Sequence, residues 1–481
     1  MPYLFNFAFV VGAQSVSAAP TLLAGLQVPI SASFHPLLPA IVYIGGRDGA
    51  LSVANLASPN PTTLPLTRVS VFSSQTSWHG LTSVHAATGA PASATFLYAT
   101  YTQNADPACT DDGTNAGNPS LRPPLTVIGC PRTGALTRWL LAADGLSVGA
   151  PQTLWVGGCS QFGANGVNMV TSDAAGFLYV AVGAGANDGR NGGADFGQFG
   201  PQPANCTAPG SAWGGHFNAL APTSSGGKVL RFAPPTAATT GPLPAPTVFA
   251  SGLHNPFRLT WARAPAARGA PAPLTPSLYS LDSGGASTTS DELNGPLQGA
   301  GQSYGWPCAL GANEPVAAFA ALPASPCSLL GPHTPAFYVS RATTSLGALE
   351  FHPPTSRWMA ADPASGLLFS FSPLDAAGWT QAAADASTIT EEAKAANPYA
   401  AGVSRVTQLM YVPASRLRGV AGLVADGDGA LLAVDYGRGE LRQILPVNGT
   451  TQGASGGAAV AASASAALFA ATLAFLLAAG V

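Results

Sequence analysis

The chain has 481 residues, a formal net charge of −3 and only 9% charged side chains, whereas 47% of its residues are hydrophobic. This apolar fraction is enough to build a folded core and excludes a disordered chain. The nearly neutral charge offers no basic surface, which excludes a nucleic-acid-binding protein.

Residues 1–30 are open to two interpretations. An apolar run at residues 4–11 and the small-residue triplet Val16-Ser17-Ala18 are typical of a signal peptide, but no Lys or Arg precedes the run. The same residues also suit the first strand of a folded domain. We predict that residues 31–446 form that domain.

From Ile41 onward, short apolar runs follow turns that contain glycine. Arg47-Asp48-Gly49 predicts a β-hairpin, because Asp-Gly supplies the positive φ of a tight turn. Similar units recur at residues 94–102, 134–145, 174–183, 226–232, 277–284, 366–373 and 427–444. No long helical periodicity is present, so the chain is all-β. Loosely repeated units over about 400 residues favour a single six-bladed β-propeller over a sandwich or barrel.

Polar side chains concentrate between residues 251 and 310, in a chain that otherwise has few charges. The stretch contains SGLHNPFRLTW, LYSLDSGGASTTSDELNG and GQSYGWPCALG. Its polar members are His254, Asn255, Arg258, Asp282, Asp291 and Glu292. Each piece joins a short strand to a loop rich in Gly, Asn or Pro, so we expect these groups to form a binding face.

Six cysteines are spaced widely, without a CxxC pair or a zinc-finger spacing. An even count of this kind suits disulfides in a secreted protein, although six buried thiols remain an alternative. The simplest pairing joins neighbours: Cys109 with Cys130, Cys159 with Cys206, and Cys308 with Cys327. Glycosylation sequons at Asn205 and Asn448 also predict passage through the secretory pathway.

Residues 447–481 form a separate C-terminal segment. The segment has no charged residue: small residues (GASGG) are followed by an uninterrupted apolar tail from Ala466 to Val481. This order predicts a glycosylphosphatidylinositol (GPI) anchor signal, with a transmembrane helix as the alternative. Both predict a membrane-attached protein at the cell surface.

Six stretches, taken in chain order, resemble the glucose/sorbosone dehydrogenase family. They are HGLTSVHAATG with FLYATYT, AAGFLYVAVGAG, GGKVLRF, SGLHNPFR, the LYSLDSG…SDELN…YGWP block, and RLRGVAGLVADGDGALLAVDYGRGEL. The cysteine-bearing loop and the tail look most like the hedgehog-interacting-protein-like branch. The resemblance implies a propeller that holds pyrroloquinoline quinone (PQQ) and Ca²⁺ over its central tunnel. It also implies oxidation of a sugar or other alcohol, with electrons passed to an external acceptor.

The resemblance assigns cofactor roles to five residues. Arg416 and Arg418 match the family's paired cofactor arginines, and as i and i+2 on a strand they would share one face. Bidentate arginine suits the planar carboxylates of PQQ. Asn255 matches a cofactor-contacting asparagine. Gly284 and Gly285 match the loop whose carbonyls hold the catalytic Ca²⁺.

Several positions depart from the family. No histidine precedes AAGFLYV, where the family has its catalytic base; Asn165 or Asn168 lies near that place, and an amide is not a useful base. Ala184 replaces a family aspartate, and His254 replaces an arginine. His254 is therefore the remaining candidate for the base. Two functions stay open: a PQQ-dependent dehydrogenase, and a catalytically silent surface propeller that binds carbohydrate or protein.

Overall fold

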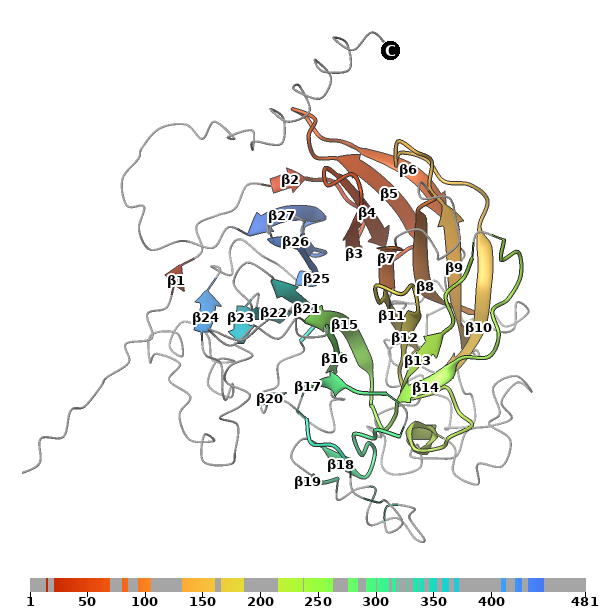
Figure 1. Cartoon of the computed structure of the whole chain (residues 1–481). Coiled ribbons are helices and arrows are strands. Elements are labelled where there is room, and N and C mark those ends of the chain that lie inside the picture. The colour runs from red at the N-terminus through yellow and green to blue at the C-terminus, as the bar shows by residue number, and fades with distance from the viewer. Residues whose placement is uncertain are drawn as a thin grey trace, which may run out of the picture. The chain divides into compact units, whose positions relative to one another are not determined.

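The structure is a computed structural model of the whole chain (Figure 1). It describes residues 14–15, 21–69, 80–84, 94–104, 132–160, 166–185, 215–236, 238–262, 276–283, 291–299, 301–310, 314–316, 319, 327, 331, 333–336, 338–340, 346–352, 357–362, 367–371, 408–411, 420–425 and 431–444. By its internal contacts the chain divides into Met1–Leu445 and Pro446–Val481, and all described residues belong to the first unit.

Five antiparallel four-stranded sheets form regular propeller blades. The first blade contains β3 (Pro29–Phe34), β4 (Ile41–Gly46), β5 (Ala50–Asn55) and β6 (Thr63–Arg68). The second contains β7 (Gly80–Val84), β8 (Phe96–Asn104), β9 (Arg132–Leu140) and β10 (Gln152–Ser160). The third contains β11 (Val167–Ser172), β12 (Leu178–Val182), β13 (Lys228–Phe232) and β14 (Thr247–Ala250). The fourth contains β15 (Pro256–Ala262), β16 (Ser277–Asp282), β17 (Asp291–Leu297) and β20 (Tyr338–Ser340). The closing blade contains β25 (Val420–Ala425), β26 (Leu431–Asp435), β27 (Glu440–Ile444) and β2 (Thr21–Leu23).

A further sheet has five strands. It contains β21 (Ala348–His352), β22 (Arg357–Asp362), β23 (Leu367–Phe371), β24 (Gln408–Tyr411) and β1 (Gln14–Ser15). β1 pairs with β24 in parallel, because an outer strand leaves backbone groups available for a further strand. The prediction of an all-β propeller is confirmed. The predicted six blades are corrected to five regular four-stranded blades, since the sixth sheet carries this extra strand.

The innermost strands form a closed ring. β3, β7, β11, β15, β21 and β25 each contact the next, and β25 contacts β3. Near the start of the chain, β2 adds antiparallel to β27 and so completes the closing blade (Figure 1). The first and last parts of the described fold are thereby joined by backbone hydrogen bonds.

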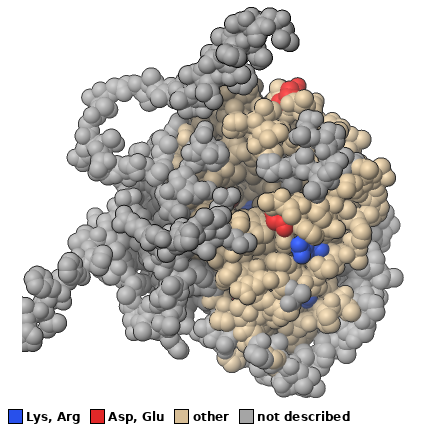
Figure 2. Space-filling model, viewed as in Figure 1, with Lys and Arg blue, Asp and Glu red and all other residues tan. Residues whose placement is uncertain are grey.

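The core consists of apolar layers between neighbouring blades. Tyr43 and Val53 of the first blade pack against Leu97 and Trp139 of the second, and similar clusters lie between the other blades. Central strands such as β4 and β12 are buried along their whole length, because blades cover both of their faces. Few of the described residues on the face shown in Figure 2 are charged.

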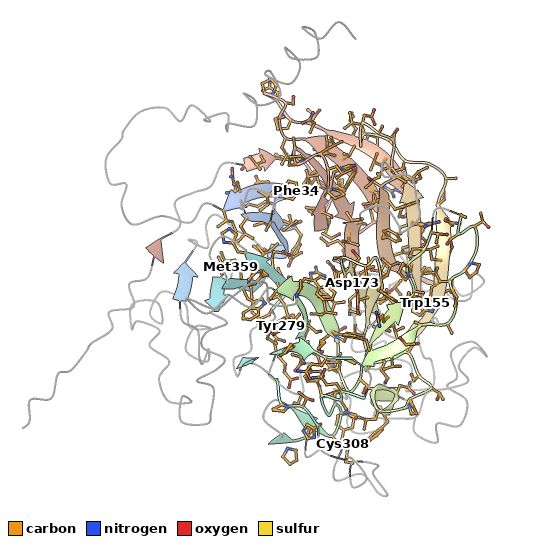
Figure 3. All side chains as sticks on the ribbon, viewed as in Figure 1. Phe34, Trp155, Asp173, Tyr279, Cys308 and Met359 are labelled. Carbon is orange, nitrogen blue, oxygen red and sulfur yellow. A yellow bond between two sulfur atoms is a disulfide. The ribbon has the colours of Figure 1, made fainter. Side chains whose placement is uncertain are left out.

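Two local predictions are confirmed. The Asp48-Gly49 hairpin joins β4 to β5, with Gly49 at φ +83°. Cys308 and Cys327 form a disulfide, and Cys308 immediately precedes β18 (Ala309–Leu310), which pairs with β19 (Glu314–Pro315) (Figure 3). The other two predicted cysteine pairs lie outside the described side chains. Among the described residues no helix is long and apolar enough to cross a membrane.

Candidate functional site

The candidate site is built on the turn that enters β15, the innermost strand of the fourth blade. His254 and Asn255 form this turn, and both are buried. Their backbone N–H groups donate to the two carboxylate oxygens of Asp282, at N–O distances of 2.9 Å for His254 and 2.5 Å for Asn255. Asp282 reaches them because it ends β16 and pairs with Pro256 across the ladder. The carboxylate therefore fixes the backbone of the turn.

The same turn holds Ser283, the residue that precedes Gly284. The Ser283 N–H donates to the Asn255 carbonyl at 3.0 Å. The Ser283 carbonyl lies 2.6 Å from His254 Nδ1. A carbonyl only accepts, so Nδ1 carries the proton and the imidazole lone pair is on Nε2 when the ring is neutral. His254 thus positions the start of the segment that contains Gly284 and Gly285.

Asn168 connects this turn to the third blade. It lies on β11, and its Nδ2 donates to Asn255 Oδ1 at 2.7 Å and to the Pro256 carbonyl at 3.2 Å. Its Oδ1 is buried and has no hydrogen-bond partner among the described residues. A buried acceptor without a partner is costly, and such atoms often mark the place of a bound polar group or water.

Three acidic residues lie on β16 and β17, the second and third strands of this blade. Asp282 and Glu292 are paired across β16 and β17, and Asp291 is next to Glu292. All three are buried. Burial raises the pKa of Asp282 well above its usual range, and the negative charge of Glu292 raises it further, while the two backbone hydrogen bonds oppose the shift. No group of three or more His, Cys, Asp or Glu within the described ranges is arranged to hold a metal ion.

Arg258 lies in the same predicted polar cluster but does not join the others. It is buried and donates to backbone carbonyls: Phe257 at 3.1 Å, Ile30 at 3.2 Å and Ala421 at 2.5 Å. Ile30 is on β3 and Ala421 is on β25, so the guanidinium links the inner strands of three blades. Burial lowers the pKa of Arg258 to about 9. Its role in the fold is structural, and the expectation of a single binding face that includes it is corrected.

Trp306 is a member of the site that the sequence analysis did not single out. Its ring packs edge-on against the His254 imidazole, with 4.4 Å between the ring centroids. The YGWP motif was visible in the sequence, but its contact with His254 depends on the fold. Ala184, which replaces the family aspartate, donates its N–H to the His254 carbonyl at 2.8 Å.

The remaining candidates lie outside the described residues. They are Arg416, Arg418, Gly284, Gly285 and Asn165. The structure therefore brings together His254, Asn255 and Asn168, and the cofactor arginines and the Ca²⁺ loop stay predictions.

Solved structures with this fold include several sugar dehydrogenases. One is a putative oxidoreductase (glucose dehydrogenase) from Thermus thermophilus, with a TM-score of 0.52, 16% identity and coverage of 89% of this chain and 99% of that one. A second is the soluble aldose sugar dehydrogenase from Escherichia coli in its apo form, with a TM-score of 0.51, 15% identity and the same coverage.

A third is the calcium structure of a carbohydrate-active enzyme of family AA12 from Trichoderma reesei, with a TM-score of 0.52, 13% identity and coverage of 91% and 98%. No protein-family model and no curated protein matches the sequence. At these identities the likeness establishes the fold. This fold is the one expected from the resemblance of the sequence motifs to the glucose/sorbosone dehydrogenase family.

Proposed function

We propose that the chain is a PQQ- and Ca²⁺-dependent dehydrogenase that oxidises a sugar or other alcohol and passes the electrons to an external acceptor. The observation that carries the proposal is the double anchoring of Ser283 by His254 and Asn255, directly before the Gly284–Gly285 segment. When bound, PQQ with Ca²⁺ would accept a hydride from the substrate carbinol. The family resemblance of the motifs and the shared fold with sugar dehydrogenases support the same reaction class.

Two of the described residues, Asn168 and Asn255, fit a bound polar ligand. Asn168 Oδ1 is a buried acceptor without a partner beside the Asn255 side chain, as expected where a polar ligand binds. Asn255 uses Oδ1 to accept from Asn168, so its Nδ2 is left as a donor for that ligand. Gly284 and Gly285 would offer carbonyls to Ca²⁺, a typical ligand type for this ion. Arg416 and Arg418 would bind the PQQ carboxylates.

A second candidate function is a silent propeller that binds carbohydrate or protein. Asn168 favours it, because an amide occupies the region in which the family has a histidine base. His254 is the available imidazole, yet its ring is buried and its Nδ1 is bonded to Ser283. A dehydrogenase without a strong base would turn over slowly while still binding its cofactor.

Calorimetric titration of PQQ into the purified protein, with and without Ca²⁺, tests the proposal. We expect saturable binding that requires Ca²⁺, because the ion, which the Gly284–Gly285 carbonyls would hold, would supply positive charge for the anionic cofactor. Binding that is absent with and without Ca²⁺ would reject the dehydrogenase and leave the silent propeller. Turnover with an artificial electron acceptor then separates an active enzyme from a cofactor-binding protein.

Two variants, measured in the same titration, test the roles of Arg416 and His254 in PQQ binding. We expect Arg416→Ala to weaken PQQ binding about 10- to 100-fold, the effect of one charge-assisted bond. We expect His254→Ala to weaken PQQ binding in the presence of Ca²⁺, because it releases Ser283. If His254→Ala instead abolishes turnover and leaves PQQ affinity unchanged, His254 is the base.

We also propose that the protein is exported and membrane-attached, on the basis of its sequons and its apolar tail. A GPI anchor predicts release from intact cells by phosphatidylinositol-specific phospholipase C. Retention after the enzyme treatment would favour the transmembrane alternative, and recovery in the cytosol would contradict both.

A further inference from the structure

An apolar cluster separate from the layers between blades lies beside the candidate site. It consists of Ala184, Phe217, Ala219, Trp306, Cys308 and Phe319, all buried. Phe217 and Ala219 belong to the short helix η4 (Gly215–Ala219), which precedes β13, and the last three members follow β17. The cluster therefore lies outside the blade layers and is built from two long connections. Two members also contact His254: the Trp306 ring packs against its imidazole, and the Ala184 N–H donates to its carbonyl.

Backbone hydrogen bonds fix the position of Trp306. Residues 302–306 run parallel to residues 251–252, with a bridge between Ser251 and Ser303. Tyr304 N donates to the Ser251 carbonyl at 3.0 Å, and Trp306 N donates to the Gly252 carbonyl at 2.9 Å. Because Gly252 is two residues before His254, this pairing brings the indole into contact with the imidazole.

Glycine at position 305 is needed for this approach. Gly305 has φ +91°, and a Cβ there would lie 2.7 Å from Cδ2 of His333. A larger residue would be strained by its backbone and would also displace His333. The path of the chain into Trp306 is therefore tightly specified.

A disulfide-closed loop also contributes a contact to the indole. Cys308 and Cys327 close a loop that contains Phe319. Phe319 packs edge-on against Trp306 at 5.4 Å between ring centroids and against Phe217 at 5.7 Å. Val316 N donates to the Cys308 carbonyl at 2.9 Å, so the loop is tied back at its start. The indole thus contacts both the His254 imidazole and Phe319 of the disulfide-closed loop.

We propose that Trp306, held in place by the Cys308–Cys327 loop, is a positioning residue for His254 and through it for Ser283. The inference rests on the proposed function, because Ser283 leads into the segment expected to bind Ca²⁺. The histidine side chain has two rotatable bonds, which together set the direction of the imidazole ring. Edge-to-face packing on one side restricts both of them and keeps Nδ1 directed at the Ser283 carbonyl.

Hydrogen exchange of the His254 Nδ1 proton, followed by NMR with ¹⁵N-labelled histidine, tests this directly. The chain has 7 histidines, and loss of one signal in His254→Gln assigns the resonance. We expect Trp306→Leu to speed the exchange about 10-fold, the effect of losing one aromatic pair. Trp358→Leu is the matched control, since Trp358 is equally buried and packs edge-on against Tyr279 at 4.7 Å, away from His254. The control should leave the exchange rate within about 2-fold of wild type.

A double variant, Cys308→Ser with Cys327→Ser, keeps the test valid if Trp306→Leu does not fold. It opens the loop without touching the indole, and we expect faster Nδ1 exchange here too. Exchange that stays at the wild-type rate, or that rises equally in Trp358→Leu, overturns the positioning role. The measurement needs no cofactor. A failure of PQQ to bind the wild-type protein would therefore reject the proposed function, while the exchange rates still decide the role of Trp306.

Discussion

Replacement of Asp282 with alanine should abolish Ca²⁺-dependent PQQ binding and lower the free energy of unfolding by about 2–4 kcal/mol. The carboxylate accepts from the backbone N–H groups of His254 and Asn255, and all three residues are buried. Alanine would leave two buried donors without partners. The turn would then move, and with it the anchor of Ser283. Urea unfolding and the PQQ titration measure the two effects.

Asp173 provides a matched control for this variant. It also accepts from two backbone N–H groups, those of Ala175 and Phe177, each at 3.0 Å, and from the Tyr179 hydroxyl at 3.0 Å. Asp173 is only partly buried, so water can replace the lost acceptor. We expect Asp173→Ala to cost about 1 kcal/mol and to leave PQQ binding unchanged. Equal losses of stability in the two variants would contradict the argument from burial.

The raised pKa of Asp282 adds a dependence on pH. The folded state holds this proton more tightly than the unfolded chain does, because burial and Glu292 raise the folded pKa. Its contribution to stability is therefore complete below the unfolded value of about 4 and is lost as the pH rises through the folded pKa. The pH dependence of unfolding should be flatter in Asp282→Ala across that range.

The fold could be predicted largely from local signals. The hairpin at Asp48-Gly49 could be predicted from these two residues alone, because they favour the geometry of a tight turn. The pattern of short apolar runs likewise predicted strands such as β12 and β13. What the sequence could not show was the strand β1 beside β24, since two residues carry no pattern and the pairing depends on a sheet edge far along the chain.

The site was only partly predictable for a similar reason. His254, Asn255 and Asp282 were grouped correctly because a strand end and a turn bring them together. Arg258 has the same polarity and lies only three residues after Asn255, yet it points to the carbonyls of Ile30 and Ala421. Its direction depends on strands that are distant in sequence. The contact of Trp306 with His254 is also a product of the tertiary fold.

Replacement of Gly80 with alanine should destabilise the protein by about 3 kcal/mol and weaken PQQ binding. Gly80 begins β7, which contacts β11 in the inner ring. A Cβ at Gly80 would overlap the Asn168 carbonyl oxygen and Met169 Cα, and it would lie 2.6 Å from Thr100 Oγ1. Two of these atoms belong to the backbone, so no rotation of a side chain relieves the overlap. β11 would have to shift, which would move the Asn168 amide away from Asn255.

Gly241→Ala is the appropriate control for this substitution. A Cβ at Gly241 would meet no atom within 4 Å, and its φ lies outside the left-handed region. Alanine there should therefore be neutral or stabilise the protein by about 0.5 kcal/mol, because it restricts the unfolded chain. Thermal unfolding and the PQQ titration should separate the two variants clearly. If Gly80→Ala matches Gly241→Ala in stability, β7 and β11 are not packed as closely as their backbones indicate, and the placement of Asn168 would need revision. If Gly80→Ala lowers stability but leaves PQQ affinity unchanged, Asn168 does not contribute to the cofactor site and its unpartnered Oδ1 has a purely structural cause.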